Sequence, residues 1–138
     1  MVSMLGVLIV AHEKKIIDRM RKIMADLKDV DTVFTSSGKE AMNRQKTARF
    51  DLVIADEALS DMTGIEFLKQ LVKVNPIVNT ALVSSLSHDD FHEATEGLGV
   101  LGQIPVEPDW VHIEEIFNNL SKIMNLSTQK VNRKGGVE

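Results

Sequence analysis

The chain has 138 residues, of which 43% are hydrophobic and 26% are charged, and its formal net charge is -4. A chain of this length can form one domain that buries roughly 70% of its unfolded surface. The acidic balance disfavours binding to nucleic acid or to an anionic membrane surface. The sequence contains no cysteine, which excludes disulfides, thiolate nucleophiles and cysteine metal sites.

The two ends of the chain differ in character. Residues 1–11 are apolar, but they are too few to span a membrane and lack the basic start of a secretory signal, so we expect a strand there. Residues 127–138 are polar and weakly patterned, and their basic residues Lys130, Arg133 and Lys134 form only a small cluster. We therefore expect one soluble, cytoplasmic domain at residues 1–126 and a flexible tail at 127–138.

Short apolar runs alternate with longer segments of helical spacing, which is the pattern of βαβ units around a parallel sheet. Ser37 with Glu40 has the spacing of a capping box, Gly97 is a helix stop, and Asp109 is an N-cap. The predicted elements, in chain order, are a strand at 5–10, a helix with an apolar stripe at 16–27, a strand at 32–35, a helix at 37–48, a strand at 52–55, a helix at 64–74, a strand at 80–83, a helix at 87–96, a short strand at 100–101 and a helix that follows Asp109.

In an open parallel sheet, ligands bind outside the carboxyl ends of the strands, so the residues that follow each strand are the candidate site. Gly97, Gly99 and Gly102 fit neither a dinucleotide fingerprint nor a P-loop, which disfavours nucleotide binding by those routes. The strand-end residues are Ala11, His12, Glu13, Asp56, Glu57, Ser84, Ser85, Ile104 and Pro105.

The run DLVIADEALSDMTG, from Asp51 to Gly64, resembles the segment of response regulator receiver domains in which a strand ends in the phosphoacceptor aspartate. The similarity spans about residues 5–126. It implies an α/β flavodoxin-like, doubly wound fold with five parallel strands in the order 2-1-3-4-5 and five helices. It makes Asp56 the candidate phosphoacceptor and Ser84 the candidate switch hydroxyl.

The resemblance also implies a function. A receiver domain of this kind is a non-enzymatic module of two-component phosphorelay signalling, and the chain holds no output domain, so we expect it to stand alone. Its expected partner is a sensor histidine kinase or a downstream effector protein. A homodimer could form through the face made by the fourth helix, the fifth strand and the fifth helix.

Several positions depart from the family pattern. Ala11 and His12 replace the acidic pair that follows the first strand, and Ile104 replaces the lysine before Pro105. Mg²⁺ prefers oxygen ligands, so we expect the degenerate site at Ala11, His12, Glu13 and Asp56 to bind it weakly, with impaired phosphorylation as the result. Further differences are Leu59 and Ser60 for the usual methionine and proline, and Leu101 for the switch aromatic. The family also implies a cis peptide bond between Ile104 and Pro105.

Alternatives remain at each level. Asp56 could take part in phosphate chemistry, or it could simply end a strand and cap a loop. His12 could pair with Asp56 in place of a metal, or point to solvent while Asp56 accepts hydrogen bonds from loop amides. The alternative function is a phosphorylation-independent pseudo-receiver that acts as a protein-interaction module. A flavodoxin-like enzyme is disfavoured because the sequence holds neither cysteine nor a nucleophile elbow.

Overall fold

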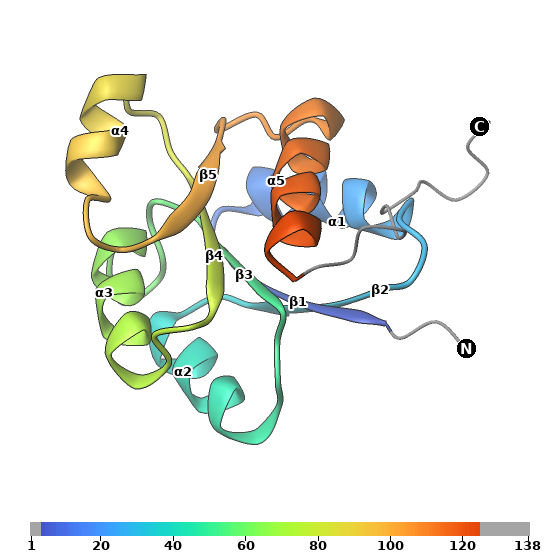
Figure 1. Ribbon diagram of the computed structural model, residues 1–138, viewed down its shortest axis with the longest axis horizontal. Coiled ribbons are helices and arrows are strands. Elements are labelled where there is room, and N and C mark those ends of the chain that lie inside the picture. Colours follow the sequence, from blue (N-terminus) through green and yellow to red (C-terminus); the bar gives the residue numbers. More distant parts are fainter. Residues whose placement is uncertain (1–3, 125–138) are drawn as a thin grey trace.

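The computed structural model describes residues 4–124, so the tail predicted at 127–138 and its boundary lie outside the described residues. Strands and helices alternate along the described chain, as Figure 1 shows. The strands are β1 (Leu5–Val10), β2 (Val30–Thr35), β3 (Leu52–Ala55), β4 (Asn79–Val83) and β5 (Val100–Ile104). The helices are α1 (Lys14–Ala25), α2 (Gly38–Thr47), α3 (Gly64–Val74), α4 (His88–Ala94) and α5 (Trp110–Ile123). None of the helices between residues 4 and 124 has the length and apolar character needed to cross a bilayer.

The five strands form one parallel sheet in the order β2-β1-β3-β4-β5, which confirms the predicted flavodoxin-like fold. β3 is buried along its whole length, and so are the last four residues of β1. This burial explains why both strands are continuous apolar runs in the sequence rather than alternating ones. Polar side chains are therefore confined to the ends of the central strands.

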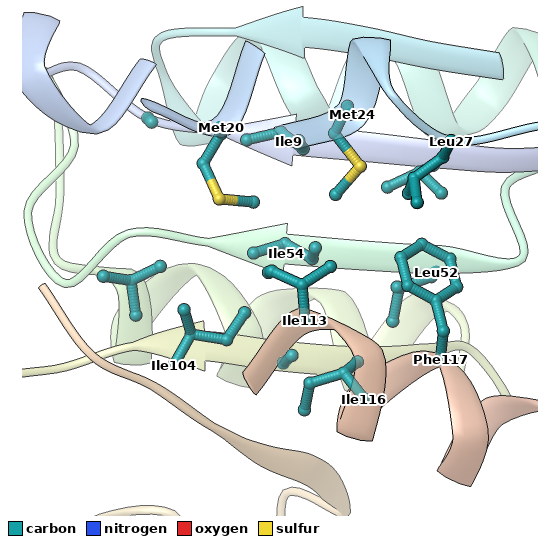
Figure 2. Packing of buried hydrophobic residues seen from close by; sticks show 14 of the residues in the cluster. Ile9, Met20, Met24, Leu27, Leu52, Ile54, Ile104, Ile113, Ile116 and Phe117 are labelled. Carbon is teal, nitrogen blue, oxygen red and sulfur yellow. The ribbon is translucent and has the colours of Figure 1, made fainter. Parts of the chain in front are cut away.

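Helices cover both faces of the sheet. α1 and α5 pack on one face, and α2 and α3 lie on the other (Figure 1). Figure 2 shows the first of these cores, where Met20 of α1 and Ile113 of α5 lie on the same side of the sheet as Ile54 of β3. The second core joins residues of α2, α3 and α4, among them Phe67 and Phe91, to the opposite face. The helical stripes predicted from the sequence thus face the sheet.

Helix starts follow the expected chemistry with one difference. Ser37 caps α2 by accepting a hydrogen bond from Glu40 N–H at 3.0 Å, but the Glu40 carboxylate accepts from Ser36 N–H and not from Ser37. The complete capping box occurs instead at α3, between Thr63 and Glu66. The predicted cap at Ser37 is therefore confirmed, whereas its reciprocal partner is wrong by one residue.

β5 is longer than predicted and irregular. Its register against β4 shifts between the pairs Thr80↔Val100 and Leu82↔Gln103, so β5 carries one extra residue there. Leu101 packs against the core that contains α5, and a Cβ on Gly102 would meet Ile116 of α5. Leu101 and Gly102 therefore both face α5. The alternation of side chains between the two faces of the sheet shifts by one residue, so Gln103 points to the opposite face.

Gly64, the first residue of α3, touches the backbone at the end of β3. Its N–H donates to Glu57 O at 3.0 Å, and a Cβ at this position would overlap the Asp56 carbonyl oxygen and lie 2.8 Å from Leu82 Cδ1. Gly38, the first residue of α2, is also crowded, but there the obstacle is the flexible side chain of Met62. A methyl group at Gly38 would thus meet a side chain that can change rotamer, whereas one at Gly64 would meet backbone that cannot.

We expect Gly64→Ala to lower the free energy of unfolding by about 2 kcal/mol or more, because the end of β3 must shift to admit a methyl group. Gly38→Ala is the matched control, and its loss should be clearly smaller because a thioether side chain can change rotamer. Urea unfolding of both variants measures the difference. Equal losses in the two variants would contradict the close approach of α3 to Asp56.

Candidate functional site

Asp56 lies directly after β3, at the carboxyl edge of the sheet. Its N–H donates to Val10 O at 2.8 Å, which extends the pairing with β1, and its Oδ1 accepts from Glu57 N–H at 2.8 Å. Only 3% of the residue is exposed. A carboxyl group is thus held at the centre of the sheet edge, where the fold predicts a site.

Burial raises the pKa of Asp56 from 3.8 to about 6, the hydrogen bond from Glu57 N–H opposes this shift, and the negative charges of Glu57 and Glu13 add to it. Desolvation disfavours the charged form of a carboxyl, and like charges do the same. Both side-chain charges that act on this pKa are therefore negative. Among the described residues, none of the charges that act on the Asp56 pKa is that of a cation.

The loop between β4 and α4 is fastened to two neighbouring strands. Glu57 Oε1 accepts from Ser85 N–H at 2.8 Å and from the Ser85 hydroxyl at 3.0 Å. From the other side, Gln103 Nε2 donates to Ser84 O at 3.2 Å and to Leu86 O at 2.8 Å. Ser84 is 4% exposed, and its Oγ accepts from Leu86 N–H at 3.1 Å. Asp56 and Ser84 thus end adjacent strands, and Glu57 and Gln103 fix the loop beside them.

Asp61 fastens the loop between β3 and α3 to the start of α2. Its Oδ1 accepts from Gly38 N–H at 2.7 Å and its Oδ2 from Lys39 N–H at 3.0 Å. These hydrogen bonds lower the pKa of Asp61 below its usual value. A carboxylate at a helix N-terminus satisfies backbone donors that have no partner within the helix. The carboxylate of Asp61 therefore has a structural role.

One expectation at the site is wrong. Within the described residues no peptide bond is cis, so the bond between Ile104 and Pro105 is trans. Trans is the lower-energy isomer of such bonds by about 0.5–1 kcal/mol, and the chain reaches the Asp109 cap of α5 without the cis form. Of the two alternatives for His12, the structure shows the one in which this residue is exposed and Asp56 accepts a hydrogen bond from a loop amide, that of Glu57. The ion pair found between residues 4 and 124 joins His112 to Asp109.

The residues that replace the family's reactive groups are directed into the core or to solvent. Ala11 is 2% exposed and Ile104 is fully buried, and both belong to the core beneath α1 and α5. Figure 2 shows the Ile104 side chain beside α5. Leu101 is partly buried against the same core. None of these three side chains supplies a charge or a hydrogen bond to Asp56.

Magnesium fits these residues poorly. Mg²⁺ requires near-octahedral oxygen ligation, whereas the position of the acidic pair offers a buried methyl group and an exposed imidazole. Glu57 already accepts two hydrogen bonds from Ser85. Across the part of the chain that the structure describes, no group of three or more His, Asp or Glu side chains is placed to hold a metal ion.

Two residues of the site were missed in the sequence. Gln103 is the one polar side chain in the β5 run VLGQI, and this interruption of an apolar strand was the available signal. Asp61 follows Asp56 by five residues in a polar loop, where a capping role for a distant helix leaves no local pattern. Both roles depend on contacts with residues far away in the chain.

Asp56→Asn should raise the free energy of unfolding at about pH 7.5 by roughly 1–3 kcal/mol. The folded-state pKa of Asp56, about 6, exceeds the unfolded value of 3.8. Between pH 3.8 and about pH 6 this carboxyl is therefore protonated to a greater extent in the native state than in the unfolded state. Stability from this group is therefore fully present below the unfolded pKa and is lost as pH rises through the folded pKa. The gain in the variant should nearly vanish at about pH 4, which urea unfolding across this range measures.

Asp61→Asn serves as the control, because its pKa is lowered and its contribution has the opposite sign. The carboxylate of Asp61 stabilises the fold above its unfolded pKa, and this contribution is lost as pH falls through the folded pKa. The variant should therefore be destabilised near neutral pH. A stabilisation by Asp56→Asn that did not change with pH would contradict the desolvation of this carboxyl.

Gln103→Leu should free the loop between β4 and α4. Loss of two hydrogen bonds should cost about 1–2 kcal/mol, and the amide of Leu86 should exchange faster with solvent than in the wild type. Gln45→Leu is the matched control, because the buried Nε2 of Gln45 has no hydrogen-bond partner in the described structure. Hydrogen exchange read by NMR distinguishes them, and unchanged exchange at Leu86 would contradict the role of Gln103.

Comparison with solved structures supports the fold. A signal receiver domain of an HD domain-containing protein from Pseudomonas fluorescens Pf-5 superimposes with a TM-score of 0.79 at 14% identity, covering 93% of this chain and 94% of the other. A receiver domain from Methanospirillum hungatei JF-1 gives 0.77 at 20% identity, with 90% and 99% covered. A chemotaxis response regulator of Vibrio cholerae gives 0.68 at 21% identity, with 90% and 98% covered.

Comparison with curated proteins found no match. The sequence matches the model of the response regulator receiver domain over residues 7–105, a span that begins in β1 and ends just after β5. This span contains both Asp56 and Ser84 at the ends of adjacent strands. The match, the strand order and the position of the buried aspartate together assign this chain to the family of response regulator receiver domains of two-component systems.

Proposed function

We propose that this receiver domain takes part in phosphorelay signalling with Asp56 as its phosphoacceptor, and that its Mg²⁺-dependent phosphorylation is impaired. The observation that carries the proposal is the charge around Asp56. Burial and the carboxylates of Glu57 and Glu13 all raise its pKa, and no cation lowers it. The acceptor is retained, but the groups that would neutralise a transferring phosphoryl group are replaced.

The chemistry makes the consequence of this charge balance clear. A carboxylate oxygen of Asp56 would attack the phosphorus of a phosphodonor, forming an acyl phosphate and releasing the donor's leaving group. The acyl phosphate carries about 1.5 to 2 negative charges at pH 7, whereas the carboxylate that it replaces carries one. Catalysis of phosphoryl transfer consists mainly of positioning and of stabilising such charge. Beside Glu13 and Glu57, this added charge is opposed rather than stabilised.

A pseudo-receiver that acts without phosphorylation is the second candidate, and the loop between β4 and α4 favours it. Glu57 and Gln103 hold this loop from both sides. The Ser84 hydroxyl oxygen accepts from Leu86 N–H within the same loop. A loop fastened in this way presents one conformation to a partner irrespective of Asp56.

A protein partner is part of both candidates. Leu86 and Val106 are 39% and 41% exposed, and they border a hollow of about 410 Å³ that Gln103, Pro105 and His112 also line. Val111 of α5 is 67% exposed. Apolar side chains around a hollow suit recognition of another protein better than recognition of an anion. We propose that a sensor histidine kinase, an effector or a second copy of the chain uses this surface in the cytoplasm.

Intact mass spectrometry after incubation with acetyl phosphate and Mg²⁺ tests the proposal. We expect little or no phosphorylated wild-type protein, and more in His12→Asp, which restores one acidic residue, and in Ala11→Asp/His12→Asp, which restores the acidic pair. His12 is exposed, so its replacement should not disturb the core, whereas the buried Ala11 makes the double variant the more costly one. Ile104→Lys is left out because it would place an ammonium group in the core.

Asp56→Asn in the restored background is the control for the site of labelling. Efficient Mg²⁺-dependent labelling of wild-type Asp56 would show that phosphorylation is not impaired. A folded Ala11→Asp/His12→Asp variant that stays unlabelled would remove Asp56 as the phosphoacceptor and leave the pseudo-receiver. Circular dichroism confirms that each variant is folded.

A further inference from the structure

His88 and His92 lie one helical turn apart on α4. Their ring centroids are 4.5 Å apart and their planes form an angle of 82°. Both residues are exposed, whereas Phe91 between them is 4% exposed and anchors the helix in the core. Residues four apart lie on the same face of a helix, so Phe91 directs this helix to the core while both imidazoles reach solvent.

The i, i+4 spacing of the two histidines is that of a two-imidazole chelate. Imidazole nitrogen bonds Zn²⁺ at about 2.0–2.1 Å, and two histidines at positions i and i+4 can bind one ion together. Rings already in edge-to-face contact at 4.5 Å need only rotate about their side-chain bonds to direct one nitrogen each at a shared point. We propose that His88 and His92 form a binding site for a late first-row divalent ion such as Zn²⁺, Ni²⁺ or Cu²⁺.

The charge of the surrounding segment favours a cation. Residues 87–99 contain four carboxylates and neither lysine nor arginine. Such a local excess of negative charge raises the concentration of divalent cations near the surface. All four acidic residues, Asp89, Asp90, Glu93 and Glu96, are exposed.

The site is a two-ligand site and separate from Asp56. Groups of three or more metal-binding side chains are absent between residues 4 and 124, so water or donors from another molecule complete the coordination. α4 begins at His88, after the Ser87 cap and the loop that carries Ser84. An ion held by both histidines would therefore join the first and second turns of α4.

The four histidines of the chain supply internal controls. His12 is exposed with no imidazole beside it, and His112 Nδ1 lies 2.7 Å from Asp109 Oδ1. Neither offers a second imidazole to an ion. An ion that requires two imidazoles should therefore bind at His88 and His92 and not at His12 or His112.

The test uses the untagged full chain near neutral pH and Ni²⁺ as the probe. We expect substoichiometric paramagnetic Ni²⁺ to broaden the imidazole NMR signals of His88 and His92 first, while those of His12 and His112 persist and Mg²⁺ has no effect. Calorimetry with Zn²⁺ should give one ion per chain. His88→Gln and His92→Gln should each weaken binding about tenfold or more, and His12→Gln should leave it unchanged.

Equal broadening of all four histidines would overturn the proposal, because it would indicate nonspecific binding at single imidazoles. Zn²⁺ affinity unchanged in a folded His92→Gln variant would overturn it as well. Both substitutions lie at exposed positions, so far-UV circular dichroism should match the wild type.

Discussion

Burial of both faces of β1 and β3 is the constraint from which the site follows. Helices cover both faces of these two strands, whose buried residues are apolar, so the polar groups that belong to them are the residues that follow each strand. Asp56 occupies the first such position after β3, and the close approach of Gly64 brings α3 against its carbonyl group. The carboxyl is thus placed at the edge of a dry core, where desolvation dominates its pKa.

Carboxylates within a few residues of one another have opposite environments. Asp56 is buried near the negative charges of Glu57 and Glu13, whereas Asp61 is exposed and accepts two backbone hydrogen bonds at the start of α2. The first arrangement costs stability when the group ionises, and the second favours the ionised form. Ionisation of Asp56 is therefore unfavourable, whereas the loop before α3 is held by the ionised carboxylate of Asp61. Among the described residues, the side-chain charges that act on the pKa of Asp56 are those of Glu57 and Glu13, and both are negative.

The β4–α4 loop joins the site to the rest of the molecule. Glu57 reaches it from the end of β3 and Gln103 from β5, so its conformation depends on two strands at once. The extra residue in β5 makes the second contact available, because it resets the phase of the strand and turns Gln103 away from α5. Leu101 lies within the irregular part of β5 and packs against the core that contains α5. A change in β5 would consequently reach the loop through hydrogen bonds and not through an aromatic side chain.

Apolar periodicity predicted the order of strands and helices along the chain, because the alternation of runs such as residues 5–10 and 52–55 with helical stripes is a local property. The order of the strands in the sheet was implied by the resemblance to receiver domains and not by the periodicity. Residue identity likewise placed Asp56 and Ser84 at strand ends and gave the caps at Ser37 and Asp109. Tertiary structure decided what no local pattern records: the trans bond before Pro105, the solvent position of His12, and the long-range contacts of Gln103 and Asp61. These depend on packing between segments distant in the chain, whose energies act only once the sheet has assembled.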